Sequence, residues 1–215
     1  MKNRQFTPLE QDILQQIMLA RRDVRGNRFL NTPIAQTDIG KILTAASWAP
    51  SVGYSQPWEF VIVNDQERKQ QVIDSFNRVN STAKNQFSTE KQRVYAQLKL
   101  EGIQEAPVNI AVFYRPSKLP VLGQSSMLET GRYSVVCAIQ NMWLYARAMN
   151  IGLGWVSILE PAEMKSIFDA PDDAEFIAYL CLGYVNEFLE QPELEQLNWE
   201  TRKPIKDSIF FESYS

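Results

Sequence analysis

Apolar residues recur at helical spacing in three parts of this 215-residue chain. The first stripe begins near Pro8 and ends at the arginines of residues 21–28. The second follows Thr37 and Asp38, which we expect to cap its helix. The third, about 127–149, is apolar on more than one face. Such a helix lies in the core of a large domain or in a subunit interface.

Short and strongly apolar runs predict strands. They lie at residues 58–63, 107–114, 154–159 and 176–185. Helices and strands alternate irregularly, and the sequence shows no βαβ repeat. We therefore expect a single α+β domain, residues 1–215, with a central mixed or antiparallel β-sheet flanked by helices.

Two segments fit poorly into such a domain. Residues 80–105 are polar and charged with little apolar stripe, which predicts a mobile helical excursion. The tail, about 196–215, has no evident way to bury Ile209, Phe210 and Phe211 against itself. We expect this tail to be an arm that embraces a partner subunit, so that the C-terminal arms are exchanged in a homodimer.

Composition then excludes several classes of protein. The net charge of −3 argues against a nucleic-acid binder, which would be strongly basic. The chain opens without the apolar region of a secretory signal, and its longest uncharged helical run is too short to cross a bilayer. We expect a cytoplasmic protein without membrane contact. Cys137 and Cys181 sit in apolar surroundings, so we expect two buried thiols rather than a disulfide or a metal site.

The lack of histidine limits the chemistry that is open to the chain. It removes the Ser-His-Asp and Cys-His nucleophile systems and the commonest zinc ligand, and we expect no metal. Proton transfer must fall to Asp, Glu, Tyr, Lys, Ser or a bound cofactor. A cofactor or the substrate itself is therefore expected to supply most of the chemistry.

Residues 21–28 read RRDVRGNR, with four arginines around one aspartate, Asp23. Guanidinium groups bind phosphate bidentately, so the cluster predicts a small anionic ligand. The other interpretation is a solvated, salt-bridged helix end, where the helix dipole also favours cations. This segment alone does not separate the two interpretations.

Residues 151–157, IGLGWVS, look like a nucleotide-binding loop but run from a helix into a strand, the reverse of the dinucleotide fingerprint. Either Gly152 and Gly154 let backbone approach a flat ring beside the Ser157 hydroxyl, or the segment is an ordinary helix-to-strand turn. A polar loop, APSVGYSQPW (49–58), leads into the first strand and says little alone.

Together these segments resemble the nitroreductase-like flavin superfamily. Within it, the closer resemblance is to the 5,6-dimethylbenzimidazole synthase (BluB-type) family. Asp23 discriminates between the two groups, because general nitroreductases usually have Ser or Thr at this place. Tyr54 and Leu128 depart from the residues usual in these proteins, and Tyr54 bears on the cross-subunit wall of the pocket. The segments that carry the resemblance are RRDVR, APSVG with QPW, LKLEGIQEAPV, MLETGRYSVVCAIQNMWL, GLGWVSIL, YLCLGY and a late Arg-x-Pro.

The resemblance implies that reduced FMN is bound as a substrate and is fragmented with O2 to 5,6-dimethylbenzimidazole, the lower ligand of cobalamin. A separate flavin reductase would supply the reduced FMN. Asp23 and Ser157 would be the catalytic residues, and residues 80–105 would form a lid over the flavin. The residues that the resemblance places on FMN are Arg21, Arg22, Asp23, Val24, Arg25, Pro50, Ser51, Gln56, Gly154, Trp155 and Arg202.

Two other functions stay open at this point. One is a conventional FMN-dependent NAD(P)H nitroreductase or flavin reductase, and the other is a flavin carrier without enzymatic activity. The pKa of Asp23 is also open, because nearby arginines lower it while a dry pocket raises it.

Overall fold

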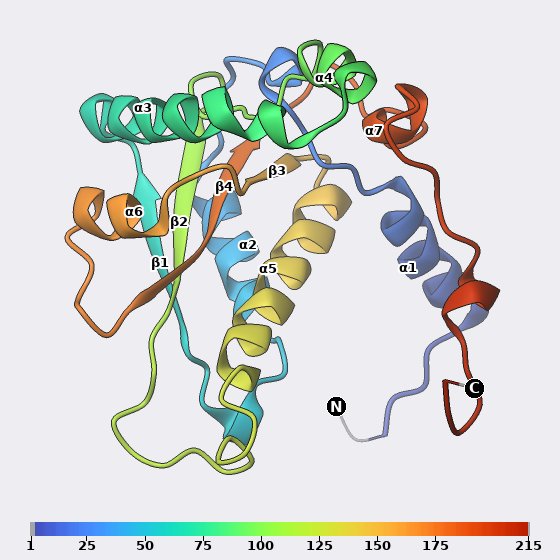
Figure 1. Ribbon diagram of the computed structural model, residues 1–215. Coiled ribbons are helices and arrows are strands. Elements are labelled where there is room, and N and C mark those ends of the chain that lie inside the picture. The colour runs from blue at the N-terminus through green and yellow to red at the C-terminus, as the bar shows by residue number, and fades with distance from the viewer. Residues whose placement is uncertain (1–2, 215) are drawn as a thin grey trace.

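The computed structural model describes residues 3–214. At its centre is a four-stranded sheet with the order β1-β2-β4-β3, in which each neighbouring pair is antiparallel (Figure 1). The α+β class with a flanked central sheet is thus confirmed, and the sheet is antiparallel rather than mixed. The strands are β1 (Trp58–Val63), β2 (Val108–Tyr114), β3 (Gly152–Val156) and β4 (Glu175–Gly183).

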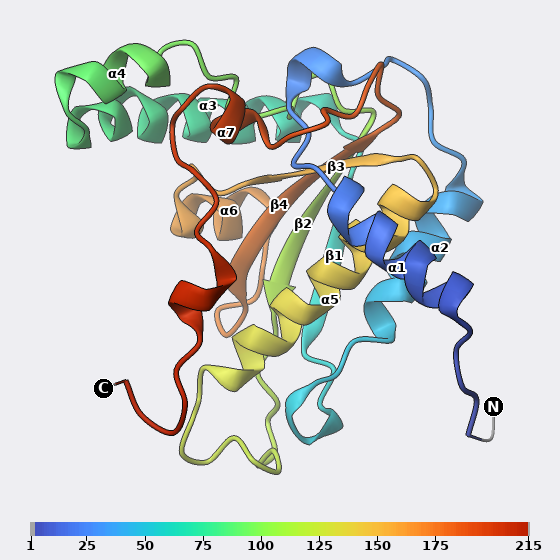
Figure 2. The ribbon, with the colours of Figure 1, turned by 90° about the vertical axis from the view of Figure 1, so that its right-hand side faces the viewer.

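Helices cover both faces of the sheet, so the domain has three layers (Figures 1 and 2). One face carries α2 (Gln36–Ser47) and α5 (Thr130–Ala148), and the other carries α3 (Gln66–Ala83) and α6 (Pro161–Ile167). The remaining helices are α1 (Pro8–Ala20), α4 (Thr89–Tyr95) and α7 (Glu193–Gln196). Single 3-10 turns lie at Gly26–Arg28, Val52–Tyr54, Lys84–Gln86 and Ile205–Ser208.

The two central strands, β2 and β4, are buried on both faces, which explains their unbroken apolar runs. Along β2, Ile110 and Val112 face the core beneath α2 and α5. The residues between and after them, Ala111 and Phe113, face the core beneath α3 and α6, because side chains alternate across a strand. Helix α5 rests on the first of these cores and leads directly into β3.

Helix α1 is well capped but poorly covered. Thr7 and Glu10 form a reciprocal capping box, and Pro8 occupies the first turn, where its missing N–H costs nothing. None of its residues is buried, and Leu9 and Met18 are 69% and 54% exposed. Helix α5 shows the same feature on one side, because its Tyr133 is 56% exposed. A single chain therefore leaves apolar faces of both helices open to solvent.

Two sequence-based expectations are wrong. Thr37 and Asp38 do not cap α2, since the helix begins at Gln36 and the N-cap is Ala35. Asp38 instead pairs with Lys41 across the first turn, 2.8 Å from its Nζ. Cys137 is exposed rather than buried, because it lies on the uncovered side of α5, whereas the thiol of Cys181 is buried as expected.

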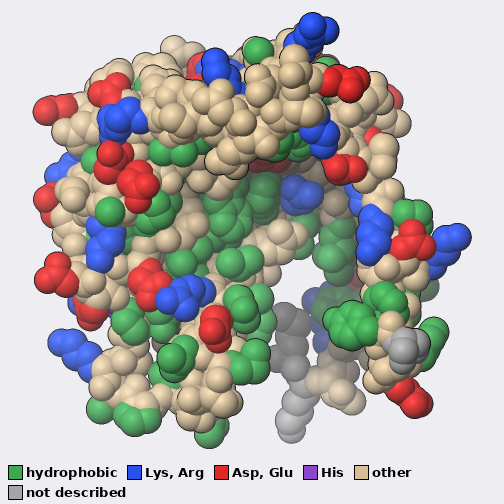
Figure 3. All heavy atoms as spheres, viewed as in Figure 1, with side chains coloured by type: hydrophobic (Ala, Val, Ile, Leu, Met, Phe, Trp, Pro, Cys, Tyr) green, Lys and Arg blue, Asp and Glu red, His purple; other side chains and the backbone are tan. Residues whose placement is uncertain are grey.

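The C-terminal tail lies on the surface. Residues 201–214 are exposed throughout, and Phe211 is 87% exposed. Figure 3 shows hydrophobic side chains gathered at the lower end of the tail, separated from the body of the domain by a hollow. Among residues 3–214, no helix combines the length and the hydropathy that a bilayer span requires.

Candidate functional site

The arginine segment runs along the outer edge of β3. Asp23 forms an isolated parallel bridge with Leu153, and the main-chain N–H of Val24 donates to the Leu153 carbonyl at 3.1 Å. A Cβ on Gly154 would lie 2.1 Å from the Val24 carbonyl oxygen, so only glycine permits this approach. The space beside the Gly154 Cα is therefore taken up by the chain's own backbone, rather than being open to a flat ring.

Helix α5 fixes the same segment from the other side. The Trp143 Nε1 donates to the Arg22 carbonyl and the Arg147 Nε donates to the Ala20 carbonyl, each at 3.0 Å. The Arg21 guanidinium lies 4.7 Å from the centre of the Trp143 ring, a cation–π arrangement. These bonds attach the end of α1 and the start of the arginine segment to one face of α5.

Asp23 is held by both of its carboxylate oxygens. Its Oδ1 accepts a hydrogen bond from the Trp155 N–H at 2.9 Å, and its Oδ2 pairs with Arg25. Arg25 in turn donates to the carbonyls of Leu100 and Trp155 at 3.1 and 3.3 Å. Burial raises the pKa of Asp23 and outweighs Arg25, Trp155 and Arg21, which lower it. The net shift in the pKa of Asp23 is therefore upward, with burial as its largest cause.

Arg22 is committed to the fold. Its guanidinium donates to the main-chain carbonyls of Leu19, Arg21 and Glu190, the first two at 2.6 and 2.7 Å. Its buried Nε has no partner among the described residues. Burial lowers the pKa of Arg22, and the charges of Arg21, Arg202 and Arg147 lower it further. Charges from three parts of the chain therefore act on Arg22, while its bonds to the Leu19 and Arg21 carbonyls are those of a cation at the end of α1.

A cavity of about 160 Å³ lies beside this cluster, between the arginine segment and two loops. It is lined by four residues of the arginine segment, by Leu98–Leu100, and by residues that precede and begin α7. These are Arg21, Arg22, Asp23 and Arg25 from the first group and Leu189, Pro192, Glu193 and Leu194 from the last. Small-molecule sites usually measure roughly 300–1,000 Å³. The cavity of one chain is therefore smaller than a usual small-molecule site.

The other expected site residues do not all reach this cavity. Pro50, Ser51 and Gln56 lie in the loop before β1, where the Gln56 N–H donates to the Ser51 Oγ at 3.1 Å. This loop is bound to the opposite end of α5, since the Val52 N–H donates to Ser134 at 3.1 Å (Figure 1).

Nine residues of α5 separate Ser134 from Trp143, which corresponds to about 13.5 Å of helix. The loop and the arginine segment of one chain therefore do not line the same cavity. Ser157 lies closer to the arginine segment, because it is exposed just after β3 and two residues beyond Trp155.

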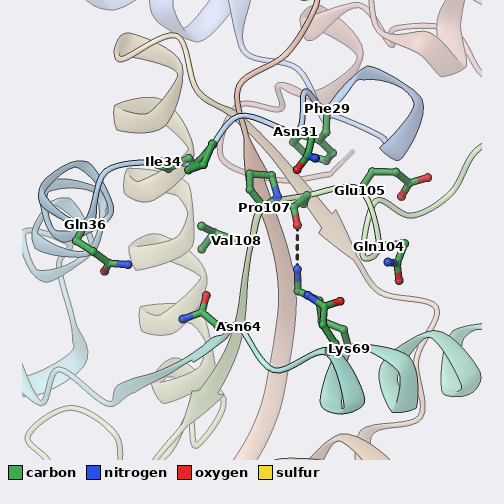
Figure 4. A pocket seen from close by; sticks show the side chains of 13 residues that line it. Phe29, Asn31, Ile34, Gln36, Asn64, Lys69, Gln104, Glu105, Pro107 and Val108 are labelled. Carbon is green, nitrogen blue, oxygen red and sulfur yellow. Dashed lines mark hydrogen bonds between the residues drawn. The ribbon is translucent and has the colours of Figure 1, made fainter.

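A second cavity, of about 650 Å³, was not foreseen from the sequence (Figure 4). Lys69 of α3 lines it at 3% exposure, and its Nζ donates to the Ala106 carbonyl at 3.0 Å. Burial lowers the pKa of this lysine. The spacing of Lys69, Val72 and Phe76 puts the lysine on the buried stripe of α3, and that spacing is the signal that could have identified it.

The antiparallel sheet between two helical layers defines an α+β protein. Its clustered arginines are suited to binding an anionic ligand, and Asp23 places a titratable carboxylate beside that ligand. Residues 18–184 match the model of the nitroreductase family. The chain therefore belongs to the nitroreductase family, and it is an oxidoreductase.

Curated relatives narrow the resemblance further. The chain is 45% identical to the 5,6-dimethylbenzimidazole synthase of Rhodospirillum rubrum over 201 residues, 93% of this chain and 94% of that protein. It is 37% identical to the 5,6-dimethylbenzimidazole synthase of Rhodobacter capsulatus over 204 residues, 94% of this chain and 97% of that protein. It is 27% identical to the putative NAD(P)H nitroreductase YfhC of Bacillus subtilis, over 92% of this chain and 93% of that protein.

Solved structures share the fold. The BluB-like flavoprotein of Clostridium difficile 630 superimposes with a TM-score of 0.69 at 21% identity, covering 93% of this chain and 99% of that one. An iodotyrosine deiodinase bound to FMN and 3-iodo-L-tyrosine gives a TM-score of 0.71 at 21% identity, covering 94% and 98%.

Proposed function

We propose that this chain is a 5,6-dimethylbenzimidazole synthase, which fragments reduced FMN with O2 to yield the lower ligand of cobalamin. The observation that carries the proposal is Asp23, an acid that stands among arginines and whose pKa is raised by burial. The likeness to two synthases over more than nine-tenths of the chain supports it. Reduced FMN, when bound, supplies the electrons that O2 accepts and the carbon skeleton of the product.

The residues of the cluster fit the phosphate of FMN. The orphaned Nε of Arg22 and the surrounding arginine charges create a positive field at a partly buried place. Arg22 and Arg25 already donate to main-chain carbonyls, so they shape the site more than they face a ligand. Arg21 and Arg202 are therefore the arginines that we assign to direct contact with the phosphate.

Asp23 is suited to holding and moving a proton beside the flavin. Its Oδ1 is oriented by the Trp155 N–H and its Oδ2 by Arg25, while 32% of the side chain remains exposed toward solvent or a ligand. A carboxyl group whose pKa is raised above its ordinary value takes up a proton more readily, which suits it to proton transfer. Ser157, exposed beyond the end of β3, would offer its hydroxyl to the flavin or to oxygen.

The remaining residues that we assign to FMN belong to the surroundings of Asp23 and to a second subunit. Val24, which lies beside β3, and Gly154 and Trp155, which belong to β3, would contribute through the main chain. The loop with Pro50, Ser51 and Gln56 would come from the partner subunit of a homodimer, because in one chain it lies at the far end of α5. The size of the single-chain cavity supports a site that two subunits complete.

Residues 80–105 would form the lid over the flavin. Leu98, Lys99 and Leu100 line the cavity of the arginine cluster. Closure would exclude water, which strengthens electrostatic interactions inside the site and prevents side reactions. A closed lid would also leave no room for a nicotinamide stacked on the flavin. The reduced FMN would therefore come from a separate flavin reductase.

An assay of flavin consumption separates this function from that of a conventional nitroreductase. The protein is incubated with FMN, NADPH and a nitroaromatic compound, with and without an added flavin reductase. We expect FMN to disappear only when the reductase is present, and NADPH to remain unused without it. Steady NADPH oxidation by the protein alone, with FMN fully recovered, would make it a nitroreductase instead.

A further inference from the structure

An aromatic cluster joins residues 84–100 to the C-terminal tail. The ring of Trp199 lies 4.9 Å from that of Phe87, edge to face at 79°, and 6.1 Å from that of Tyr95. The rings of Phe87 and Tyr95 are themselves 5.6 Å apart. These separations fall within the range of favourable aromatic pairs. The half-buried Trp199 thus packs against two rings from the segment that leads to Leu98.

Polar contacts reinforce the cluster. The Nζ of Lys91 lies 5.0 Å from the centre of the Trp199 ring and 3.9 Å from a carboxylate oxygen of Glu200. The Tyr95 hydroxyl donates to the Asn80 side chain at 2.6 Å, which attaches the cluster to the end of α3. Tyr95 is also buried, at 8% exposure. Residues 84–100 are therefore attached both to the end of α3 and to the tail.

The two sides of this contact also border the arginine cavity. Leu98–Leu100 follow the aromatic residues of the lid, and residues 189–194 precede Trp199 in the tail. Arg202 follows Trp199 by only three residues, which span at most about 11 Å of extended chain. The position of Trp199 therefore limits where the Arg202 guanidinium can lie, and the charge of Arg202 reaches Arg22.

We propose that Trp199 is a positioning residue, which the rings of Phe87 and Tyr95 hold so that Arg202 stays beside Arg22 and the lid stays over the arginine cavity. Closure of the lid and binding of the phosphate by Arg202 are then coupled, because both depend on the position of the Trp199 ring. The part that concerns phosphate rests on the proposed binding of FMN. The contact between lid and tail does not.

A double-mutant cycle on flavin binding tests the link to Arg202. Affinities for FMN and for riboflavin, which lacks the phosphate, are measured for the wild type, Trp199→Ala, Arg202→Ala and the double variant. We expect each single change to weaken FMN binding roughly tenfold, and Arg202→Ala to leave riboflavin binding nearly unchanged. The double variant should bind FMN about as well as either single variant, because both changes remove the same contact.

Trp199→Phe, which keeps a ring in the cluster, should retain most of the affinity for FMN. Independent effects, giving a roughly hundredfold loss in the double variant, would overturn the link between Trp199 and Arg202. A wild type that binds FMN no better than riboflavin would overturn the phosphate assignment, and with it the proposed role of the arginines. These two failures are distinguishable because only the second concerns the wild type.

Limited proteolysis without flavin tests the contact between lid and tail by itself. We expect Trp199→Ala and Lys91→Ala to be cut within residues 84–98 several times faster than the wild type. Arg93→Ala is the matched control, because Arg93 is an exposed cation on the same helix as Lys91 and should leave the rate unchanged. Equal cleavage of the wild type and Trp199→Ala would overturn the proposal.

Discussion

At the residue scale, the pKa of Asp23 depends both on its neighbours in the sequence and on residues that only the fold brings close. The neighbouring arginines are adjacent in the sequence, so their tendency to lower the pKa is evident from the order of the residues alone. The opposing burial depends on Leu153 and Trp155, which are some 130 residues away and meet Asp23 only through the fold. The sequence therefore showed that Asp23 has arginines as neighbours, but it could not show in which direction the pKa of Asp23 is shifted.

The raised pKa of Asp23 predicts how stability depends on pH. The folded chain binds this proton more tightly than the unfolded chain, in which the pKa is close to 3.8. Relative to Asp23→Asn, the wild type should therefore gain stability as the pH falls through the folded pKa toward that value, and lose this gain as the pH rises. Urea unfolding of both proteins over a series of pH values, from about pH 4 upward, measures the difference. Asp169→Asn, which alters an exposed carboxylate that also pairs with an arginine, is the control. The opposite trend would mean that the arginines dominate.

Substitution of Arg21 and substitution of Arg22 should have different effects on flavin binding and on stability. Arg22 bonds three carbonyls, so Arg22→Ala should weaken binding of FMN and riboflavin alike and lower Tm. Arg21→Ala leaves those bonds intact and should weaken FMN binding by roughly tenfold while sparing riboflavin. Calorimetric titration of both flavins separates the two. If Arg22→Ala affected FMN alone, Arg22 would be the arginine that faces the phosphate.

At the element scale, apolar pattern located the central elements well. The run at 58–63 is β1, and the run at 107–114 contains β2, because strands buried on two faces leave an unbroken signal. The cap of α2 was missed, since Thr37 suits an N-cap chemically but the main chain turns helical one residue before it. Cys137 was misplaced because composition does not reveal which side of α5 lacks a neighbour.

The pairing of the arginine segment with β3 depends on one glycine. Gly154→Ala would bring its Cβ within 2.1 Å of the Val24 carbonyl oxygen, so the segment must move away from β3. We expect a loss of about 2 kcal/mol or more in the free energy of unfolding, and weaker flavin binding. Gly40→Ala is the matched control, because nothing lies within 4 Å of its Cβ in α2. That change should stabilise the protein by up to about 1 kcal/mol. Equal melting temperatures for Gly154→Ala and the wild type would show that the approach is dispensable.

At the scale of the whole molecule, the segments that we assign to FMN lie apart in one chain. The arginine cluster and the loop with Pro50 and Ser51 lie at opposite ends of α5. The apolar faces of α1 and the tail are exposed, with Leu9 at 69% and Phe211 at 87%. The sequence indicated the exposed tail through Ile209, Phe210 and Phe211, which have no evident place in the core, but it did not indicate that α1 is uncovered. It could not supply the geometry, because the distance along α5 appears only once the loop and the arginine segment are folded onto it.

Removal of the end of the tail tests the proposed homodimer. A chain that ends at Lys203 keeps Trp199 and Arg202 but lacks Ile209, Phe210 and Phe211. We expect the full chain to sediment as a dimer. The dimer of the shortened chain should have a dissociation constant at least about a hundredfold higher, because each buried aromatic side chain contributes roughly 1.5–3 kcal/mol. Analytical ultracentrifugation over a dilution series gives both constants. Equal dissociation constants would show that the tail does not embrace a partner.

The central claim is that the chain consumes reduced FMN, with Asp23 handling protons. The most direct measurement loads the protein with photoreduced FMN without oxygen, admits O2, and quantifies the small molecules by mass spectrometry for the wild type and Asp23→Asn. We expect 5,6-dimethylbenzimidazole from the wild type in proportion to the FMN lost, and at least about a hundredfold less from Asp23→Asn, the usual scale for general acid–base catalysis. Both proteins should bind the flavin. Complete recovery of oxidised FMN from the wild type would contradict the account.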